Sequence, residues 1–323
     1  MKHSFKKAIR AVGFLCILIG VTVGSSYLLM PKGNDAEDGI NNPVAHGFLS
    51  EPENTIDITV IGNSDAYSGF SPMVLWETFG YTSYVSGEGK QSPAQSYAML
   101  KKVLERHHPR LAVLETDNFF SRSKVVESAA RIVNAGLGSP FSVFQYHDRW
   151  KTVKAKELFK KPNYLAHCAF KGQWVSTEVK PYNGGEYMVK TARERKIPKA
   201  GKNAVDAFLD LCRKEQVEVL FVAMPSASSW SYKKHNAVKR FADDRGIPFL
   251  DLNLDRDRFR FDWTTDTRDG GNHLNNQGAA KATRFIGNYI ADHYAISDHR
   301  AEEAYQQWDA DYREFLRTET GRK

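Results

Sequence analysis

The sequence predicts an α/β fold, in which a mostly parallel sheet is covered by helices on both faces, preceded by one transmembrane helix. Short apolar runs typical of buried strands recur along the chain, at 56–61, 82–85, 111–114, 217–222 and 248–250. Patterns typical of helices lie between several of these runs, at 93–106, 201–214, 230–245 and 277–294. Strands that alternate with helices form parallel sheets through right-handed crossovers. Catalytic groups are then expected at the carboxyl ends of the strands.

The N-terminus carries the transmembrane prediction. Residues 1–10 include four basic side chains and no acidic one, and residues 11–30 contain no charged residue. About twenty apolar residues at the rise of a helix span a bilayer core. The small residues 24–26 permit signal cleavage, but the apolar run continues to Met30, which favours an uncleaved signal anchor over a cleaved signal peptide. Because basic flanks stay in the cytoplasm, we predict a single-pass cell-membrane protein whose remaining chain is extracellular.

Length and charge bound the rest of the prediction. The chain has 323 residues, 41% of them hydrophobic, which is enough for one large domain with short appendages. Its net charge is +7, and leaving out the four basic residues of the N-terminal flank gives about +3 for the external part. No nucleic-acid partner is therefore predicted, whereas a mildly basic surface suits an anionic envelope polymer or plain solvation. Cys168 and Cys212 permit one external disulfide without establishing it.

We divide the external part into a linker, a folded domain and a C-terminal helix. Residues 31–53 are polar and punctuated by Gly, Asn and Pro, as expected of a linker. The domain is predicted at 54–295, with an insertion at about 121–197 where aromatic and basic residues interrupt the alternation. We expect the insertion to contain some helix and to pack over or beside the active edge, either as a sugar-stacking surface or as a small core. Residues 296–323 are expected to form a packing or solvated helix.

Two short segments far apart in the sequence carry the chemistry. The first predicted strand runs into Gly62-Asn63-Ser64, and a late turn contains Asp269 and His273 before the last predicted helix. A serine hydroxyl needs a histidine to take its proton and a carboxylate to hold that histidine's tautomer, so these side chains suit a nucleophile, a base and an orienting acid. The alternative is that Ser64 only caps the following helix and that His273 only belongs to a hydrogen-bonded turn.

These segments resemble the SGNH/GDSL hydrolase superfamily. Within it, the chain looks like the membrane-anchored extracellular branch related to the teichoic-acid D-alanylation transfer protein and to polysaccharide O-acetylation proteins. The resemblance covers about residues 54–295. Further segments carry it in order along the chain: 89–93, 114–117, 224–226 with Trp230, 234–236, 273–275 and 278–281. Each segment alone is a weak signal, and their order and spacing together are fairly specific.

The resemblance implies a fold and a set of roles. The fold is a three-layer α/β/α sandwich. Ser64 is implied as nucleophile, His273 as general base and Asp269 as the acid that orients the base. The backbone N–H groups of Ser64 and Gly89 are implied as an oxyanion hole, a type of contact worth about 3 to 4 kcal/mol per donor.

The sequence departs from the usual family motifs at three points. Asn63 stands where an Asp commonly precedes the nucleophile. The third-block Gly-x-Asn-Asp is missing, and Asn118 is the candidate for its side-chain oxyanion donor. Asp269 precedes His273 by four residues instead of three, although the two glycines between them tolerate the unusual backbone angles that one extra residue requires. Asp266 remains a competitor for the triad acid.

Other candidate site residues have weaker support. Trp230, His235 and Asn236 follow a predicted strand end and are candidates for substrate binding, although a surface or core role fits equally well. Glu115 and Asp117 are close enough to the predicted active edge to bind a hydroxyl. No cofactor and no metal site is predicted.

The triad implies an acyl-enzyme, and the resemblance implies what the enzyme acts on. We predict an extracytoplasmic serine acyltransferase that moves an acetyl or D-alanyl group onto a cell-envelope polysaccharide or teichoic acid. A multi-pass membrane acyltransferase is the implied partner. A surface carbohydrate esterase would use the same residues with water as the acceptor. The third alternative is a non-catalytic polymer-binding or assembly protein on a degenerate hydrolase fold.

Overall fold

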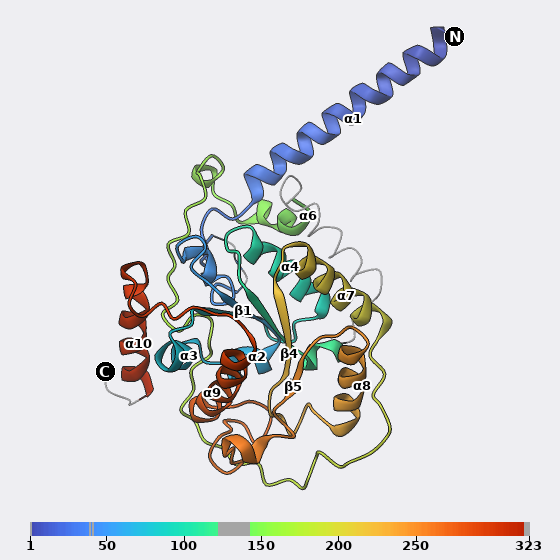
Figure 1. Ribbon diagram of the computed structural model, residues 1–323. Helices are drawn as coiled ribbons and strands as arrows, with labels where there is room; N and C mark the ends of the chain where they lie inside the picture. Colours follow the sequence, from blue (N-terminus) through green and yellow to red (C-terminus); the bar gives the residue numbers. More distant parts are fainter. Residues whose placement is uncertain (1, 39, 41, 122–142, 320–323) are drawn as a thin grey trace.

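A five-stranded parallel sheet forms the centre of the molecule (Figure 1). The computed structural model describes residues 2–38, 40, 42–121 and 143–319. Its strands are β1 (Ile58–Gly62), β2 (Ser83–Gly87), β3 (Leu111–Glu115), β4 (Glu218–Ala223) and β5 (Phe249–Asp251). They pair in the order β2-β1-β3-β4-β5, and every pairing is parallel. The predicted strands are confirmed to within about two residues at each end, because parallel strands buried on both faces give continuous apolar runs.

Helices cover both faces of this sheet. One layer consists of α4 (Pro93–Leu104), α7 (Lys199–Lys214) and α8 (Tyr232–Asp243). The other consists of α2 (Ser64–Gly69), α3 (Pro72–Phe79) and α9 (Asn276–His293). Ile61 of β1 belongs to the buried cluster under the first layer, and its neighbour Val60 belongs to the cluster under the second. This alternation follows from the two-residue period of a strand, and the predicted three-layer α/β/α architecture is confirmed.

The helix ends follow local signals in the sequence. Ser92 and Gln95 form a capping box at the start of α4. The side chain of Asn275 accepts a hydrogen bond from Gly278 N at the start of α9. Gly80 ends α3 in the left-handed conformation, with φ of 71°. The predicted helices of the domain are therefore found at their expected places, whereas the eight-residue α3 was not predicted.

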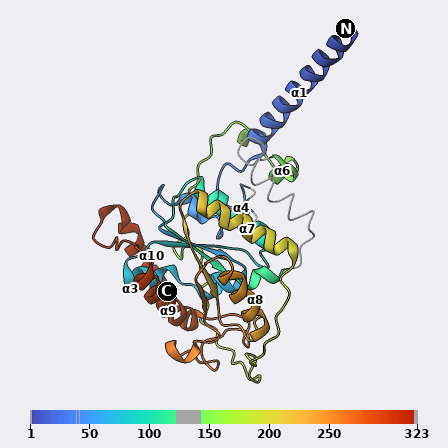
Figure 2. The same ribbon diagram turned by 45° about the vertical axis from the view of Figure 1, so that its right-hand side comes forward.

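α1 (Lys2–Leu29) projects from the body as a single helix (Figures 1 and 2). Residues 5–29 have a mean hydropathy of 2.1 and are almost wholly exposed. Among the described residues, this is the helix that is long and apolar enough to cross a membrane, which fits an anchor or a signal sequence. Its C-terminal end is tied to the body, because Nη1 of Arg149 donates to the carbonyl of Leu29 at 2.8 Å.

The linker prediction is wrong for its second half. Phe48, in a short 3-10 helix at Gly47–Ser50, is fully buried and packs edge-on against the rings of Tyr84 and His107. Full burial of a Phe side chain is worth about 1.5 to 3 kcal/mol, which a solvated linker would lose. The packed domain therefore starts before the predicted boundary at residue 54.

The predicted insertion is only partly described. Its residues 122–142 lie outside the described residues, and three short helical segments follow: α6 (Val143–Tyr146) and 3-10 turns at His147–Lys151 and Ala155–Glu157. Between 158 and 197 the chain has little regular structure. This part contains Cys168, which like Cys212 is a free cysteine, so no disulfide joins them.

The C-terminal helix α10 (Gln306–Glu319) packs on α3. The rings of Trp76 and Trp308 lie 5.5 Å apart between their centroids, and Nε1 of Trp76 donates to Asp309 at 2.9 Å. Phe315 completes this small buried cluster. The tail is therefore a packing helix, one of the two roles expected from its sequence.

Candidate active site

The candidate site lies at the carboxyl edge of the sheet, between β1 and β3. The chain runs from β1 to β2 on one side and then returns past β1 to β3 on the other side. The direction of strand addition therefore reverses at this point. Ligands of open α/β sheets bind at such reversals. β1 ends at Gly62. Only glycine fits at this position, because a Cβ here would lie 2.5 Å from Cβ of Glu115 on β3. Ser64 follows directly at the start of α2.

The residue that caps α2 is Asn63. Its backbone is extended, and its Oδ1 accepts from the amide of Asp65 at 2.9 Å. Its Nδ2 donates to Asp117 Oδ2 at 3.2 Å, which ties the strand end to the segment after β3. Asn63, and not Ser64, therefore caps the helix, so the alternative explanation of Ser64 as a helix cap is wrong. Tyr67 lies one helical turn after Ser64, so the two side chains are neighbours on the surface of α2.

The late turn assembles a histidine–carboxylate pair. Asp269 accepts from the backbone N–H of His273 at 2.8 Å and from its ring Nδ1 at 2.5 Å. Gly270 and Gly271 have φ of 83° and 100°, which only glycine adopts without strain, so they accommodate the extra residue in the spacing. Burial opposes ionisation of Asp269, but the hydrogen bonds from His273 and Asn272 outweigh it and lower the pKa of Asp269. The carboxylate therefore stays charged and holds the Nδ1–H tautomer.

Asp266 is engaged elsewhere. It is fully buried and forms an ion pair with Lys281 at 2.8 Å. Its Oδ2 also accepts from the amide of Asp262 at 2.7 Å. Of the two acids considered for the triad, the structure pairs Asp269 with His273.

The second ring nitrogen of His273, Nε2, faces the first turn of α2, and Nδ2 of Asn272 lies 3.3 Å from it. Nε2 lies 4.0 Å from Oδ1 of Asp65, the residue after Ser64. In the part of the chain that the structure describes, no hydrogen bond joins Ser64 directly to His273. Catalytic hydrogen bonds are often long in unliganded enzymes and tighten only with substrate, so the missing bond does not contradict the predicted triad.

Asp65 forms a buried acidic group with Glu115 and Asp117, and of these three the sequence indicated only Glu115 and Asp117. Burial and then the charge of Asp117 raise the pKa of Asp65 well above its ordinary value. Burial and then Asp65 do the same to the pKa of Glu115. Lys234 donates to Oδ1 of the third acid, Asp117, at 2.6 Å, and its charge also opposes the rise in the pKa of Asp65 and of Glu115.

The two predicted oxyanion donors other than Ser64 differ in position. Gly89 lies in an exposed turn after β2, and a Cβ placed on it would meet only the Tyr67 hydroxyl, at 3.8 Å. It therefore lies on the Tyr67 side of the site. Asn118 is fully buried, and its Nδ2 donates to Ser96 Oγ at 2.9 Å. Because this side-chain amide donates to another buried residue, the geometry does not favour Asn118 as a donor to substrate.

The three residues predicted to bind substrate have partners of their own. Trp230 is 4% exposed, and its Nε1 donates to Asp251 at 3.0 Å. The same carboxylate bonds Nδ1 of His235 at 2.7 Å. None of the three contacts Ser64, Asp269 or His273 among the described residues. Trp230 is thus a core residue, and His235 supports it from α8.

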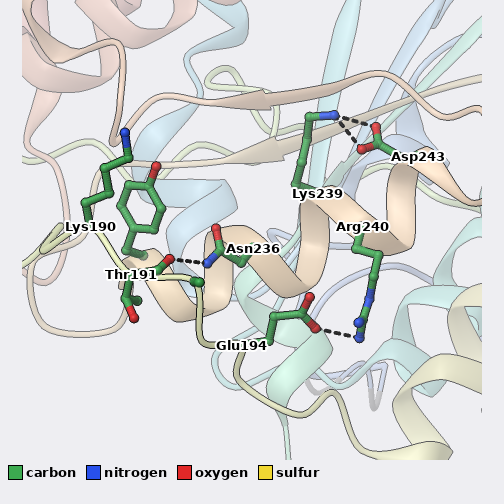
Figure 3. Close-up of a pocket in the computed structure, with 9 residues that line it drawn as sticks. Lys190, Thr191, Glu194, Asn236, Lys239, Arg240 and Asp243 are labelled. Carbon is green, nitrogen blue, oxygen red and sulfur yellow. Dashed lines mark hydrogen bonds and ion pairs between the residues drawn. The ribbon is translucent and has the colours of Figure 1, made fainter.

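Asn236 fastens an irregular segment to α8. Its Nδ2 donates to the carbonyls of Thr191 and Arg193, at 2.6 and 3.0 Å. A pocket of about 540 Å³ opens beside it (Figure 3). Ion pairs of Lys239 with Asp243 and of Arg240 with Glu194 lie along its wall. Ser64, Asp269 and His273 are not among the residues that line this pocket, so it is separate from the predicted triad.

An aromatic wall adjoins Ser64 instead. Trp174 is 61% exposed, its amide donates to the carbonyl of Tyr67 at 2.9 Å, and the two ring centroids are 6.3 Å apart. The guanidinium of Arg268 lies 5.8 Å from the Trp174 ring and donates to Ser68 at 2.9 Å. The sequence pointed to Trp174 only as one aromatic residue of the insertion. Tyr67 and Arg268 carried no signal of their own.

The described residues contain no group of three or more His, Cys, Asp or Glu side chains arranged to hold a metal ion. A serine beside a charged histidine–carboxylate pair, with an exposed aromatic surface next to it, can carry out acyl transfer through the serine oxygen.

No family model matches the chain, and no curated protein does either. Similar solved structures include a family 3 carbohydrate esterase from Clostridium thermocellum, with 14% identity and a TM-score of 0.40 over 74% of this chain and 96% of that one. A lipase/acylhydrolase from Enterococcus faecalis has 11% identity and a TM-score of 0.39, over 75% and 99% of the two chains. A GDSL-like lipase from Bacteroides thetaiotaomicron has 12% identity and a TM-score of 0.37, over 73% and 87%. At these identities and TM-scores the likeness assigns no activity to this chain.

Proposed function

We propose that the chain is an extracytoplasmic serine acyltransferase that moves a small acyl group, acetyl or D-alanyl, onto hydroxyls of a cell-envelope polysaccharide or teichoic acid. The observation that carries the proposal is the position of His273. Its Nδ1 is held by Asp269 at 2.5 Å, and its Nε2 faces the helix turn that Ser64 begins. This is the arrangement in which a histidine can take the proton of a serine hydroxyl.

The reaction follows in two balanced steps. Ser64 Oγ attacks the carbonyl carbon of an ester or thioester donor while its proton passes to Nε2 of His273, and the leaving alcohol or thiol departs with that proton. An acceptor hydroxyl then gives its proton to His273 and attacks the acyl-enzyme, and the proton returns to Ser64. Asp269 remains ionised throughout and stabilises the imidazolium. On this proposal a multi-pass membrane acyltransferase supplies the acyl group.

The surroundings of Ser64 support a sugar acceptor. The ring of Trp174 is exposed beside the nucleophile's helix, and Arg268 and Tyr67 place polar donors around it. The C–H face of a sugar ring can bury its apolar surface on such a ring while its hydroxyls hydrogen-bond the polar groups. A surface carbohydrate esterase remains the second candidate, because the partly exposed His273 and Asp269 leave an acyl-enzyme open to water.

The direct test is the acyl-enzyme itself. The full chain in detergent is incubated with an activated acetyl or D-alanyl ester, and peptide mass spectrometry locates the adduct. We expect the adduct on Ser64 and its loss when a polysaccharide acceptor is added, with the acyl group recovered on the polymer. Recovery of free acid alone would favour the esterase. Absence of any Ser64 adduct, and of Ser64 labelling by a fluorophosphonate, would instead favour a non-catalytic polymer-binding protein.

The acceptor role of the aromatic wall is separately testable. Trp174→Ala is expected to raise KM for a sugar acceptor about 5- to 10-fold, since stacking of this kind is worth roughly 1 kcal/mol. The rate of Ser64 acylation by a small activated ester should stay unchanged. Trp150→Ala is the matched control, because Trp150 is similarly exposed, at 67%, but lies near the end of α1. Equal effects of the two substitutions would contradict the assignment.

A further inference from the structure

A basic and aromatic segment lies against the end of α1 that joins the body. We call residues 147–166 the juxtamembrane strap. Its Asn163 amide donates to the carbonyl of Lys32 at 2.7 Å. The side chain of Asn34 exchanges two hydrogen bonds with the backbone of Ala166, each of 2.9 Å. The strap is therefore fixed beside the C-terminal end of α1, where it appears in light green in Figures 1 and 2.

The strap carries unbalanced positive charge. It contains six Lys or Arg residues and two acidic ones. The acids are matched, since Glu157 pairs with the buried Arg149 at 3.6 Å and Asp148 pairs with Lys151 at 2.8 Å. Four exposed lysines form no ion pair with any residue that the structure describes: Lys154, Lys156, Lys160 and Lys161. Exposed lysines near a membrane surface attract anionic headgroups.

The strap also carries large apolar side chains that are exposed. Trp150 is 67% exposed, Phe159 79% and Leu165 76%. Single exposed apolar residues are common on soluble surfaces. Three of them close to a membrane-spanning helix, in the same short segment as four unpaired lysines, match the composition of a segment that lies at the bilayer interface.

We propose that the juxtamembrane strap docks on anionic lipid headgroups at the membrane surface from which α1 emerges, and that this contact holds the body in one orientation. The inference rests on the proposed anchoring by α1. The orange segment that follows β5 lies at the end of the body opposite α1 (Figures 1 and 2), and the late turn belongs to this segment of the chain. Docking of the strap therefore turns the triad away from the bilayer and toward polymer in the envelope.

The test uses the full chain in nanodiscs of phosphatidylcholine, with or without phosphatidylglycerol. Hydrogen exchange of the strap peptides is expected to slow about threefold or more when the anionic lipid is present, and high salt should reverse the effect. Changing all four unpaired lysines to glutamine should abolish the difference between the two lipids. The matched control changes four exposed lysines far along the chain and should retain it: Lys190, Lys196, Lys199 and Lys233.

Two failures can be told apart. If the wild-type chain washes out of the nanodiscs, the anchoring by α1 is wrong. If the chain stays inserted but exchange of the strap is the same in both lipids, the docking inference is wrong. Protection of the strap by soluble polyphosphate but not by phosphatidylglycerol would also overturn it, because the partner would then be a polymer.

Discussion

Ser64→Ala and His273→Ala are each expected to lower acyl turnover by about 10³-fold or more, and the double variant should be no worse than either alone. The reason is that the two side chains act as one unit. Without the imidazole, the serine proton has no acceptor, and without the hydroxyl there is no atom to acylate. The steady-state rate at which the leaving group is released from an activated ester measures turnover. Mass spectrometry monitors the acylation of Ser64.

Asp269→Asn tests which of the two acids, Asp269 or Asp266, orients His273. An amide at this position can no longer hold the Nδ1–H tautomer, so we expect a loss of about 10³- to 10⁴-fold in kcat while the fold persists. Asp266→Asn is the control. Asp266 pairs with Lys281 and does not touch the imidazole, so its loss should lower the melting temperature and leave kcat of the folded protein nearly unchanged. The reverse pattern would make Asp266 the triad acid.

The parts of this molecule that the sequence predicted well are those in which partners lie close along the chain. Asp269 and His273 are four residues apart in one turn, so the pairing that holds the tautomer is a local property. The strand that ends at Gly62 is an apolar run buried on both faces, and such runs identify parallel strands. The approach of this turn to Ser64 could be inferred because strands of one parallel sheet end at a common edge.

The parts that sequence reasoning missed depend on contacts between distant segments. Asp65 looks like an ordinary residue of a short helix, and only folding surrounds it with acids from β3 and its following turn. An aromatic residue after a strand end suggested a cleft at Trp230, but Asp251 of β5 pairs with its indole and draws it into the core. Trp174 reaches Tyr67 from a segment more than a hundred residues away.

A second large effect is expected at Lys171, which joins three segments that the sequence analysis treated as separate. The side chain is fully buried, and its Nζ lies 2.7 Å from carboxylate oxygens of both Glu51 and Asp311. It also lies 4.7 Å from the centroid of the Trp308 ring. Glu51 belongs to the supposed linker, Lys171 to the insertion and Asp311 to the C-terminal helix. One buried cation thus holds the beginning, middle and end of the domain together.

Lys171→Met should lower the free energy of unfolding by about 3 to 5 kcal/mol, because it leaves two buried carboxylates with His167 as their neighbour and without the buried ammonium. Chemical denaturation of the full chain in detergent measures the loss. Lys239→Met is the matched control, since its pair with Asp243 is exposed and its loss should cost less than about 0.5 kcal/mol.

Adding Glu51→Gln and Asp311→Asn to Lys171→Met removes the buried negative charges and should recover part of the loss. If the triple variant is less stable than Lys171→Met, the cost lies in lost packing around the lysine stem and the electrostatic account is wrong.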